Sequence, residues 1–286
     1  MRLRRAAAAG VLVALSSVLS YAQNQVFSTR IEAVRVDVLV TDQGRPVRGL
    51  QRADFEVRDN GVLQQVDAIS FEQVPLNVIL ALDMSGSVSG ERLNHLRRAG
   101  GALLDALMTD DQAALLSFTH VIAQGSGLTK DRARLRTALA AAYAAGGTAL
   151  VDSSYAGLMV GESDVGRALL LVFSDGVDTA SWLSPARVLE TAKRCDVVVY
   201  GVSLAGSQKS TFLRDLSAFT GGRLLESESI RNLSDVFVQI LDEFRQRYLL
   251  TYSPQGVPRS GWHRLDVRVR GRNVTVKARP GYLGGT

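Results

Sequence analysis

The strongest constraint on the fold is a series of short apolar runs in the middle of the chain, separated by segments of helical periodicity. The runs show no polar alternation, which is typical of strands buried on both faces of a parallel sheet. They occur at residues 78–82, 113–118, 168–173 and 197–202. Helices are expected at residues 91–107, 130–143, 149–159, 185–193, 211–219 and 233–244. This order predicts a doubly wound, mostly parallel α/β domain, which we place at residues 74–247.

The two flanks of this domain alternate with a period of two instead. In the N-terminal flank, four valines between residues 34 and 40 share one face, while Arg35 and Asp37 point the other way, as in a half-buried strand. The segments 26–73 and 248–286 are each too small to fold well alone. We predict that they pair into one small β-sandwich into which the α/β domain is inserted. Separate pairing of each flank with the central domain is the alternative.

The N-terminal residues 1–22 have the pattern of a secretory signal peptide. Three arginines precede an apolar run at residues 6–19, and small residues stand before a cleavage point after Ala22. The run is shorter than the roughly 20 residues of a membrane span, and an uncleaved N-terminal anchor is the alternative. We therefore expect an exported protein, periplasmic or extracellular, with no membrane span in the mature chain.

The formal charge of +5 falls to +2 without the three arginines of the signal segment, so most of the basicity belongs to that segment. The remaining basic side chains of the C-terminal strands alternate outward and predict a solvated sheet face, not a nucleic-acid surface: Arg264, Arg268, Arg270, Arg272, Lys277 and Arg279. One cysteine and three histidines exclude a disulfide framework and a Cys- or His-rich metal cluster. Cys195 is expected to be a small buried residue.

Hydroxyl and carboxylate groups follow the buried runs at three places. Asp83, Ser85 and Ser87 stand at alternate positions after the first run, Asp175 follows a later run, and Thr148 precedes a helix. In an open α/β sheet, the loops beyond the carboxyl ends of the strands lie together, so these oxygens can converge. Such hard donors suit Mg²⁺ or Mn²⁺, with Ca²⁺ also possible, better than zinc.

This arrangement closely resembles the von Willebrand factor A domain and its metal-ion-dependent adhesion site. That site has an Asp-x-Ser-x-Ser loop, a Thr from a second loop and an Asp from a third. The resemblance implies that Ser85, Ser87 and Thr148 bind the metal directly, while Asp83 and Asp175 act directly or through water. Residues 34–47, 54–57, 248–254 and 276–282 resemble the opening and closing segments of the VWFA-related family of exported, acidobacterial-type proteins.

These features predict a metal-dependent protein-binding module for adhesion or assembly, not an enzyme. Two carboxylates roughly neutralise a divalent ion and leave one coordination position for an Asp or Glu carboxylate of a partner protein. The alternative is a Mg²⁺-dependent hydrolase of the cell envelope, which needs a further carboxylate as nucleophile or base. Asp152 and Asp178 are the nearest candidates, although a helix-start or supporting position is favoured for both. The sequence specifies neither the partner nor the oligomeric state.

Overall fold

The computed structural model describes residues 33–71, 74–164, 166–208 and 210–285. The signal segment 1–22 and the first residues of the N-terminal flank lie outside this range, so their predictions remain predictions. Residues 32–286 belong to one compact unit.

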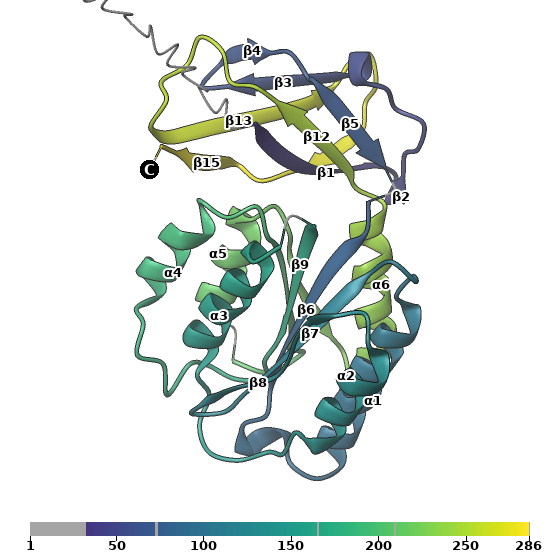
Figure 1. The fold of residues 1–286 in the computed structure, drawn as a ribbon, viewed down its shortest axis with the longest axis vertical. Coiled ribbons are helices and arrows are strands. Elements are labelled where there is room, and N and C mark those ends of the chain that lie inside the picture. Colours follow the sequence, from purple (N-terminus) through teal and green to yellow (C-terminus); the bar gives the residue numbers. More distant parts are fainter. Residues whose placement is uncertain (1–32, 72–73, 165, 209, 286) are drawn as a thin grey trace, which may run out of the picture. The chain divides into compact units, whose positions relative to one another are not determined.

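The central sheet has six strands in the order β11-β10-β9-β6-β7-β8 (Figure 1). Their bounds are Leu76–Asp83 (β6), Gln112–Phe118 (β7), Ile122–Thr129 (β8), Arg167–Phe173 (β9), Val198–Leu204 (β10) and Leu224–Ser227 (β11). All neighbouring strands pair in parallel except β7 and β8, which are antiparallel. The predicted mostly parallel α/β fold is confirmed. The edge strands β8 and β11 were missed because they are largely exposed or half-buried and lack a continuous apolar run.

Helices cover both faces of this sheet, with α1, α2 and α6 on one side and α3, α4 and α5 on the other (Figure 1). Their bounds are Glu91–Ala106 (α1), Arg132–Ala141 (α2), Leu150–Glu162 (α3), Pro185–Ala192 (α4), Thr211–Phe219 (α5) and Leu233–Arg245 (α6). Single 3₁₀ turns occur at Arg52–Asp54 (η1), Gly86–Val88 (η2) and Ile230–Asn232 (η3).

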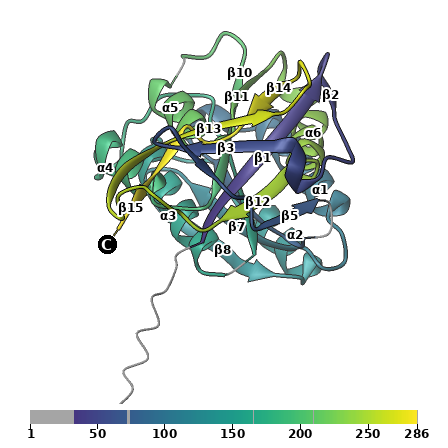
Figure 2. The same cartoon turned by 90° about the horizontal axis from the view of Figure 1, so that it is seen from above.

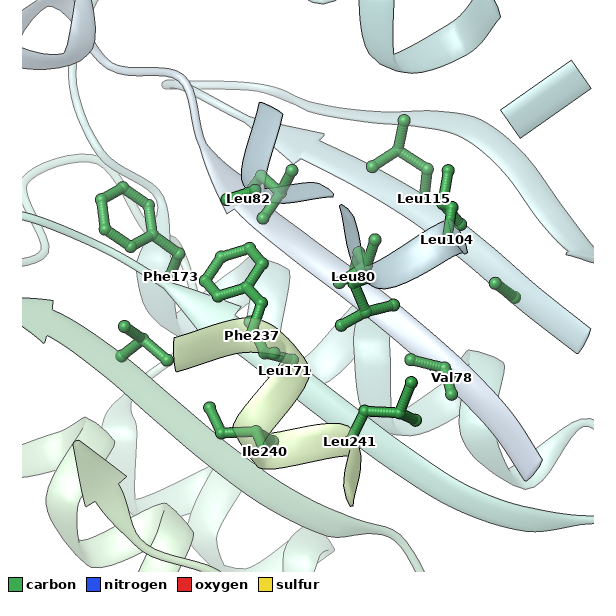
Figure 3. Packing of buried hydrophobic residues seen from close by; sticks show 14 of the residues in the cluster. Val78, Leu80, Leu82, Leu104, Leu115, Leu171, Phe173, Phe237, Ile240 and Leu241 are labelled. Atoms are coloured by element: carbon green, nitrogen blue, oxygen red, sulfur yellow. The ribbon is translucent and has the colours of Figure 1, made fainter. Parts of the chain in front are cut away.

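Strand β6 is apolar apart from Asn77 and Asp83, and every residue from Leu76 to Asp83 is buried. Alternate side chains such as Leu80 pack toward α1 and α6, while Ile79 and Ala81 pack toward α3. In Figure 3, Phe237 and Leu241 of α6 lie against the side chains of the sheet, with the Phe237 ring centroid 6.5 Å from that of Phe173. Burial on both faces fixes the sheet between its helices.

Two antiparallel sheets combine strands from both ends of the chain. Their strands are Val34–Asp42 (β1), Arg45–Pro46 (β2), Phe55–Asp59 (β3), Val62–Gln64 (β4), Ala68–Phe71 (β5), Tyr248–Tyr252 (β12), Gly261–Val269 (β13), Thr275–Lys277 (β14) and Gly281–Gly284 (β15). One sheet has the order β14-β1-β12-β5, with β2 on β1, and the other the order β15-β13-β3-β4 (Figure 2). They share one apolar core, which confirms the expected β-sandwich from both flanks.

Two charged residues expected on solvated strand faces are buried instead. Asp37 in β1 forms an ion pair with the buried Arg167 at the start of β9. Arg279, next to β14, pairs with Asp196 at 3.0 Å. Both partners come from the α/β domain, so the alternation within one strand could not reveal them. The junction between the two domains is therefore polar and paired.

Candidate metal centre

The candidate centre lies at the carboxyl end of the central sheet. Asp83 is the last residue of β6, and Asp175 follows the neighbouring strand β9 by two residues. The chain enters β6 from the antiparallel sheets at Leu76, so the centre is at the opposite end of this strand from the domain junction.

Four of the five expected ligand residues form one connected polar cluster. Asp83 accepts hydrogen bonds from the Ser85 backbone N–H at Oδ1 (2.8 Å) and from the Ser174 hydroxyl at Oδ2 (2.6 Å). The Ser85 and Ser87 hydroxyl oxygens are 3.1 Å apart, and the Ser87 hydroxyl donates to Asp175 Oδ1 (2.7 Å). Ser87 lies in the one-turn helix η2, and this turn places its hydroxyl near that of Ser85. Ser174, directly before Asp175, is a member of the cluster that sequence reasoning missed.

Thr148 is buried, and backbone hydrogen bonds tie its segment to the two loops that carry the cluster. The Gly146 carbonyl accepts from the Gly86 N–H (3.1 Å), which ties the segment before Thr148 to the loop after β6. The Thr148 carbonyl accepts from the N–H groups of Thr179 (2.9 Å) and Ala180 (3.1 Å) in the loop after β9. The structure therefore brings the three predicted loops together.

Gly146 is a position that strongly favours glycine. Its φ of +63° lies in the left-handed region, and a Cβ built there would lie 2.3 Å from Nδ1 of His120. His120 had no assigned contact from the sequence, yet its ring packs directly against this loop. No spacing pattern signals this contact, because β7 and the loop before α3 meet only in the fold.

Asp83 differs from the other buried aspartates in its electrostatic environment. Its side chain is fully buried, and this burial raises the pKa of the carboxyl group above its usual value. Among the described residues, the other buried aspartates each have a basic partner: Asp37 with Arg167, Asp59 with His263, and Asp111 with Arg245. Over the same residues, the partners of Asp83 are hydroxyl and N–H groups.

Arg92 is a basic side chain that contacts the cluster, and sequence reasoning did not single it out. It lies in the first turn of α1 and is largely exposed. Its Nη1 lies 3.5 Å from Asp175 Oδ2 and 3.3 Å from the Ser87 carbonyl oxygen. This guanidinium adds positive charge at the outer side of the cluster and leaves the buried Asp83 without a basic partner.

Asp152 and Asp178 hold the loop after β9 against the start of α3. Asp178 accepts from the backbone N–H of Val151 (2.9 Å) and of Ser181 (3.1 Å). Asp152, in the first turn of α3, accepts from the N–H groups of Trp182 (2.9 Å) and Leu183 (2.8 Å). Both carboxylates are engaged by backbone N–H groups.

The five expected ligand residues supply two carboxylates and three hydroxyls. Within the part of the chain that the structure describes, no group of three or more His, Cys, Asp or Glu side chains could hold a metal ion. A cation at this centre would therefore depend on the hydroxyls of Ser85, Ser87 and Thr148. Oxygen ligands of this kind fit a hard divalent cation.

A family model of the von Willebrand factor type A domain matches residues 77–239, which is more than half of the chain. The chain belongs to this family. The match spans the residues from β6 into α6, including all three loops of the candidate centre. The likeness of the flanks to the exported bacterial group remains a prediction.

The chain is also similar to three other proteins. The von Willebrand factor type A structure from Catenulispora acidiphila has a TM-score of 0.55 and 13% identity over 80% of this chain and 72% of that one. Proximal thread matrix protein 1 from the mussel byssus, solved with a zinc-occupied MIDAS motif, has a TM-score of 0.55 and 14% identity over 64% of this chain and 48% of its own. The uncharacterized protein sll0103 of Synechocystis sp. is 32% identical over 88 residues, 30% of this chain and 21% of that protein. Identities of 13–14% show a shared fold alone.

Proposed function

We propose that this von Willebrand factor type A protein is a divalent-cation-dependent protein-binding module. The observation that carries the proposal is the environment of Asp83, a buried carboxylate whose partners among the described residues are hydroxyl and N–H groups. A buried charge is costly unless it is paired or coordinates a metal. A divalent cation held by Asp83 and Asp175 would neutralise both carboxylates.

The ligands would be the hydroxyls of Ser85, Ser87 and Thr148 together with the two carboxylates, bound directly or through water. Small cations that prefer oxygen fit this donor set, so Mg²⁺ is the first choice, with Mn²⁺ and Ca²⁺ as alternatives. The zinc-occupied motif of the mussel byssus protein supports a divalent cation at the same place in the fold.

The partner would be a protein that presents an Asp or Glu carboxylate. When bound, the cation supplies an electrophilic position for that carboxylate oxygen, and the guanidinium of Arg92 adds positive charge beside it. The pattern of residues 1–22 supports export to the periplasm or cell exterior, where the module would act in adhesion or assembly. Within the described residues, no helix combines the length and apolar character that crossing a membrane requires.

The competing function, a Mg²⁺-dependent hydrolase, needs a carboxylate free to act on substrate. Asp152 and Asp178 accept backbone N–H groups instead, which favours a binding module. Turnover of a generic phosphate or ester substrate by the wild type, lost in Asp178→Asn with Mg²⁺ binding retained, would favour the hydrolase.

The binding function is tested by a pull-down from the exported proteome in Mg²⁺ and in chelator, with Thr148→Ala as the matched variant. We expect a partner to be recovered by the wild type in Mg²⁺ alone, because the cation links the two proteins. Equal recovery in all three arms would contradict the proposal.

A further inference from the structure

The most exposed large apolar side chains of the described residues all lie on the loops around the candidate metal centre. Trp182 is 94% exposed, Tyr143 72% and Val121 56%. Trp182 is in the loop after β9, and Val121 is in the loop after β7. Because β9 and β7 are the two neighbours of β6, these side chains follow strands on either side of Asp83.

Backbone hydrogen bonds tie the Tyr143 and Val121 segments to the loops of the centre. Ala145, two residues after Tyr143, donates its N–H to the Met84 carbonyl (2.8 Å) in the loop after β6. Thr119, two residues before Val121, accepts at its carbonyl from the Ala149 N–H (2.7 Å), next to the ligand Thr148. Both exposed side chains therefore stand within two residues of a contact to the centre.

The loop that carries Trp182 is held firmly in place. Its own N–H and that of Leu183 donate to Asp152, and the Ser181 hydroxyl donates to Asp178 and accepts from the Asp152 N–H (3.1 Å). The Leu183 side chain packs against the apolar core on the α3 side of the sheet. The loop is thus fixed on both sides of an indole that lies in solvent and contributes nothing to that core.

This combination is favourable for a binding surface. Aromatic side chains dominate the energetics of protein interfaces, and a segment that is already ordered loses little conformational entropy on binding. At the centre itself, a bound divalent cation would offset Asp83 and Asp175, and the exposed Arg92 guanidinium beside Asp175 adds one positive charge. Acidic and apolar groups on the partner would complement this surface.

We propose that Trp182, with Tyr143 and Val121, forms an apolar rim that contacts the partner directly beside its metal-bound carboxylate. The ligand is therefore a protein segment in which an Asp or Glu is flanked by apolar side chains. This inference rests on the proposed function, because the cation provides the central contact. The rim would favour partner segments that have apolar side chains beside the acidic residue over those that do not.

The chain has two tryptophans, so a Trp262→Phe protein reports on Trp182 alone. The probes are synthetic peptides with one central Asp, flanked either by Leu and Phe or by Ser. In Mg²⁺ we expect the Leu/Phe peptide to shift the indole emission to shorter wavelength and to protect it from acrylamide, with no effect in chelator. By titration calorimetry, Trp182→Ser in the otherwise wild-type chain should bind this peptide about tenfold more weakly or worse, as expected for a central aromatic contact.

Leu63→Ser is the matched control, because Leu63 is 51% exposed on β4, away from the loops of the centre. Its peptide affinity should equal that of the wild type. The rim would be overturned if Trp182→Ser and wild type bound the peptide with equal affinity, or if the wild type showed no preference for the Leu/Phe peptide. Mg²⁺-dependent stabilisation of the protein would still support the cation site in that case. Absence of that stabilisation in the wild type would overturn both. Trp182-dependent binding to phosphatidylcholine–phosphatidylglycerol vesicles, without a peptide response, would overturn the rim in favour of a membrane contact.

Discussion

The domain junction and the carboxyl edge of the central sheet treat buried carboxylates in opposite ways. At the junction, Asp37 faces the guanidinium of Arg167. At the carboxyl edge, Asp83 is more deeply buried, yet it accepts hydrogen bonds from the Ser174 hydroxyl and the Ser85 N–H. We infer that the paired carboxylate stabilises the domain junction, whereas the carboxylate without a basic partner among the described residues belongs to the proposed cation site.

The amino end of β6 gives a second case of compensation within the same strand. Asp111 accepts from the Leu76 N–H (2.9 Å), where β6 begins, and pairs with Arg245 of α6 (2.7 Å). Strand β6 therefore runs from a neutralised carboxylate at one end to Asp83 at the other. Substitution of Asp111 at one end is therefore a control for substitution of Asp83 at the other.

Removal of the Asp37–Arg167 ion pair at the domain junction should have the largest effect on the free energy of unfolding. Arg167→Ala leaves Asp37 buried without its guanidinium, and removing one partner of a buried pair costs about 3–5 kcal/mol of unfolding free energy. Urea denaturation followed by circular dichroism measures this loss. Lys130→Ala, which removes an exposed pair with Asp110, is the control and should change stability little. Similar stability of Arg167→Ala and wild type would show that the pair does not hold the junction.

The carboxyl edge depends on backbone geometry at Gly146. In Gly146→Ala, a left-handed residue with a side chain costs about 1–2 kcal/mol, and the clash with His120 adds to this. The double variant with His120→Ala should regain the unfolding free energy that the clash removes, but it should still lack the unfolding free energy that the left-handed backbone removes. Urea denaturation of the three proteins separates the two contributions. No loss in Gly146→Ala would mean that this loop is free to rearrange.

The smallest effect concerns Cys195, which precedes β10 at the amino end of the sheet and is buried. Burial, with a smaller contribution from Glu162, raises the pKa of its thiol to about 12. At pH 8 the group should therefore remain protonated and unreactive. We expect a thiol reagent to label the native protein very slowly and the urea-unfolded protein rapidly. Rapid labelling of the native chain would show that this end of the sheet opens.

Much of the fold could be predicted from local pattern. The apolar runs of β6 and β9 report burial directly, because each residue of these strands is covered on its side of the sheet. The alternation of β1 predicts only the burial of the face that carries its four valines. The edge strand β8 could not be predicted, because most of its residues are exposed or half-buried. Its sequence, which includes Gly125 and Gly127, therefore shows neither an apolar run nor an alternation of apolar and polar residues. The burial of Asp37 and Arg279 also depends on partners from another domain.

The candidate centre could be predicted to the level of residue types and loops. Asp83, Ser87 and Asp175 are connected as expected, because loops after neighbouring parallel strands must lie side by side. The packing of His120 on Gly146 and the position of Arg92 could not be predicted, since they depend on how separate loops close. The exposure of Trp182 could not be predicted either, because it depends on the hydrogen bonds that fix its loop to the start of α3.

Neutralisation of the buried Asp83 carboxylate by a divalent cation is the core of the proposed function. Its most direct test is thermal unfolding of wild type, Asp83→Asn and Asp111→Asn, each in Mg²⁺ and in chelator. In chelator, Asp83→Asn should be as stable as wild type or more so, because the amide removes an uncompensated charge, whereas Asp111→Asn should be clearly destabilised. Saturating Mg²⁺ at 100 times its dissociation constant should stabilise wild type and Asp111→Asn by about 2.7 kcal/mol and leave Asp83→Asn unchanged. A strongly destabilised Asp83→Asn in chelator, with no response of the wild type to Mg²⁺, Mn²⁺ or Ca²⁺, would contradict the claim.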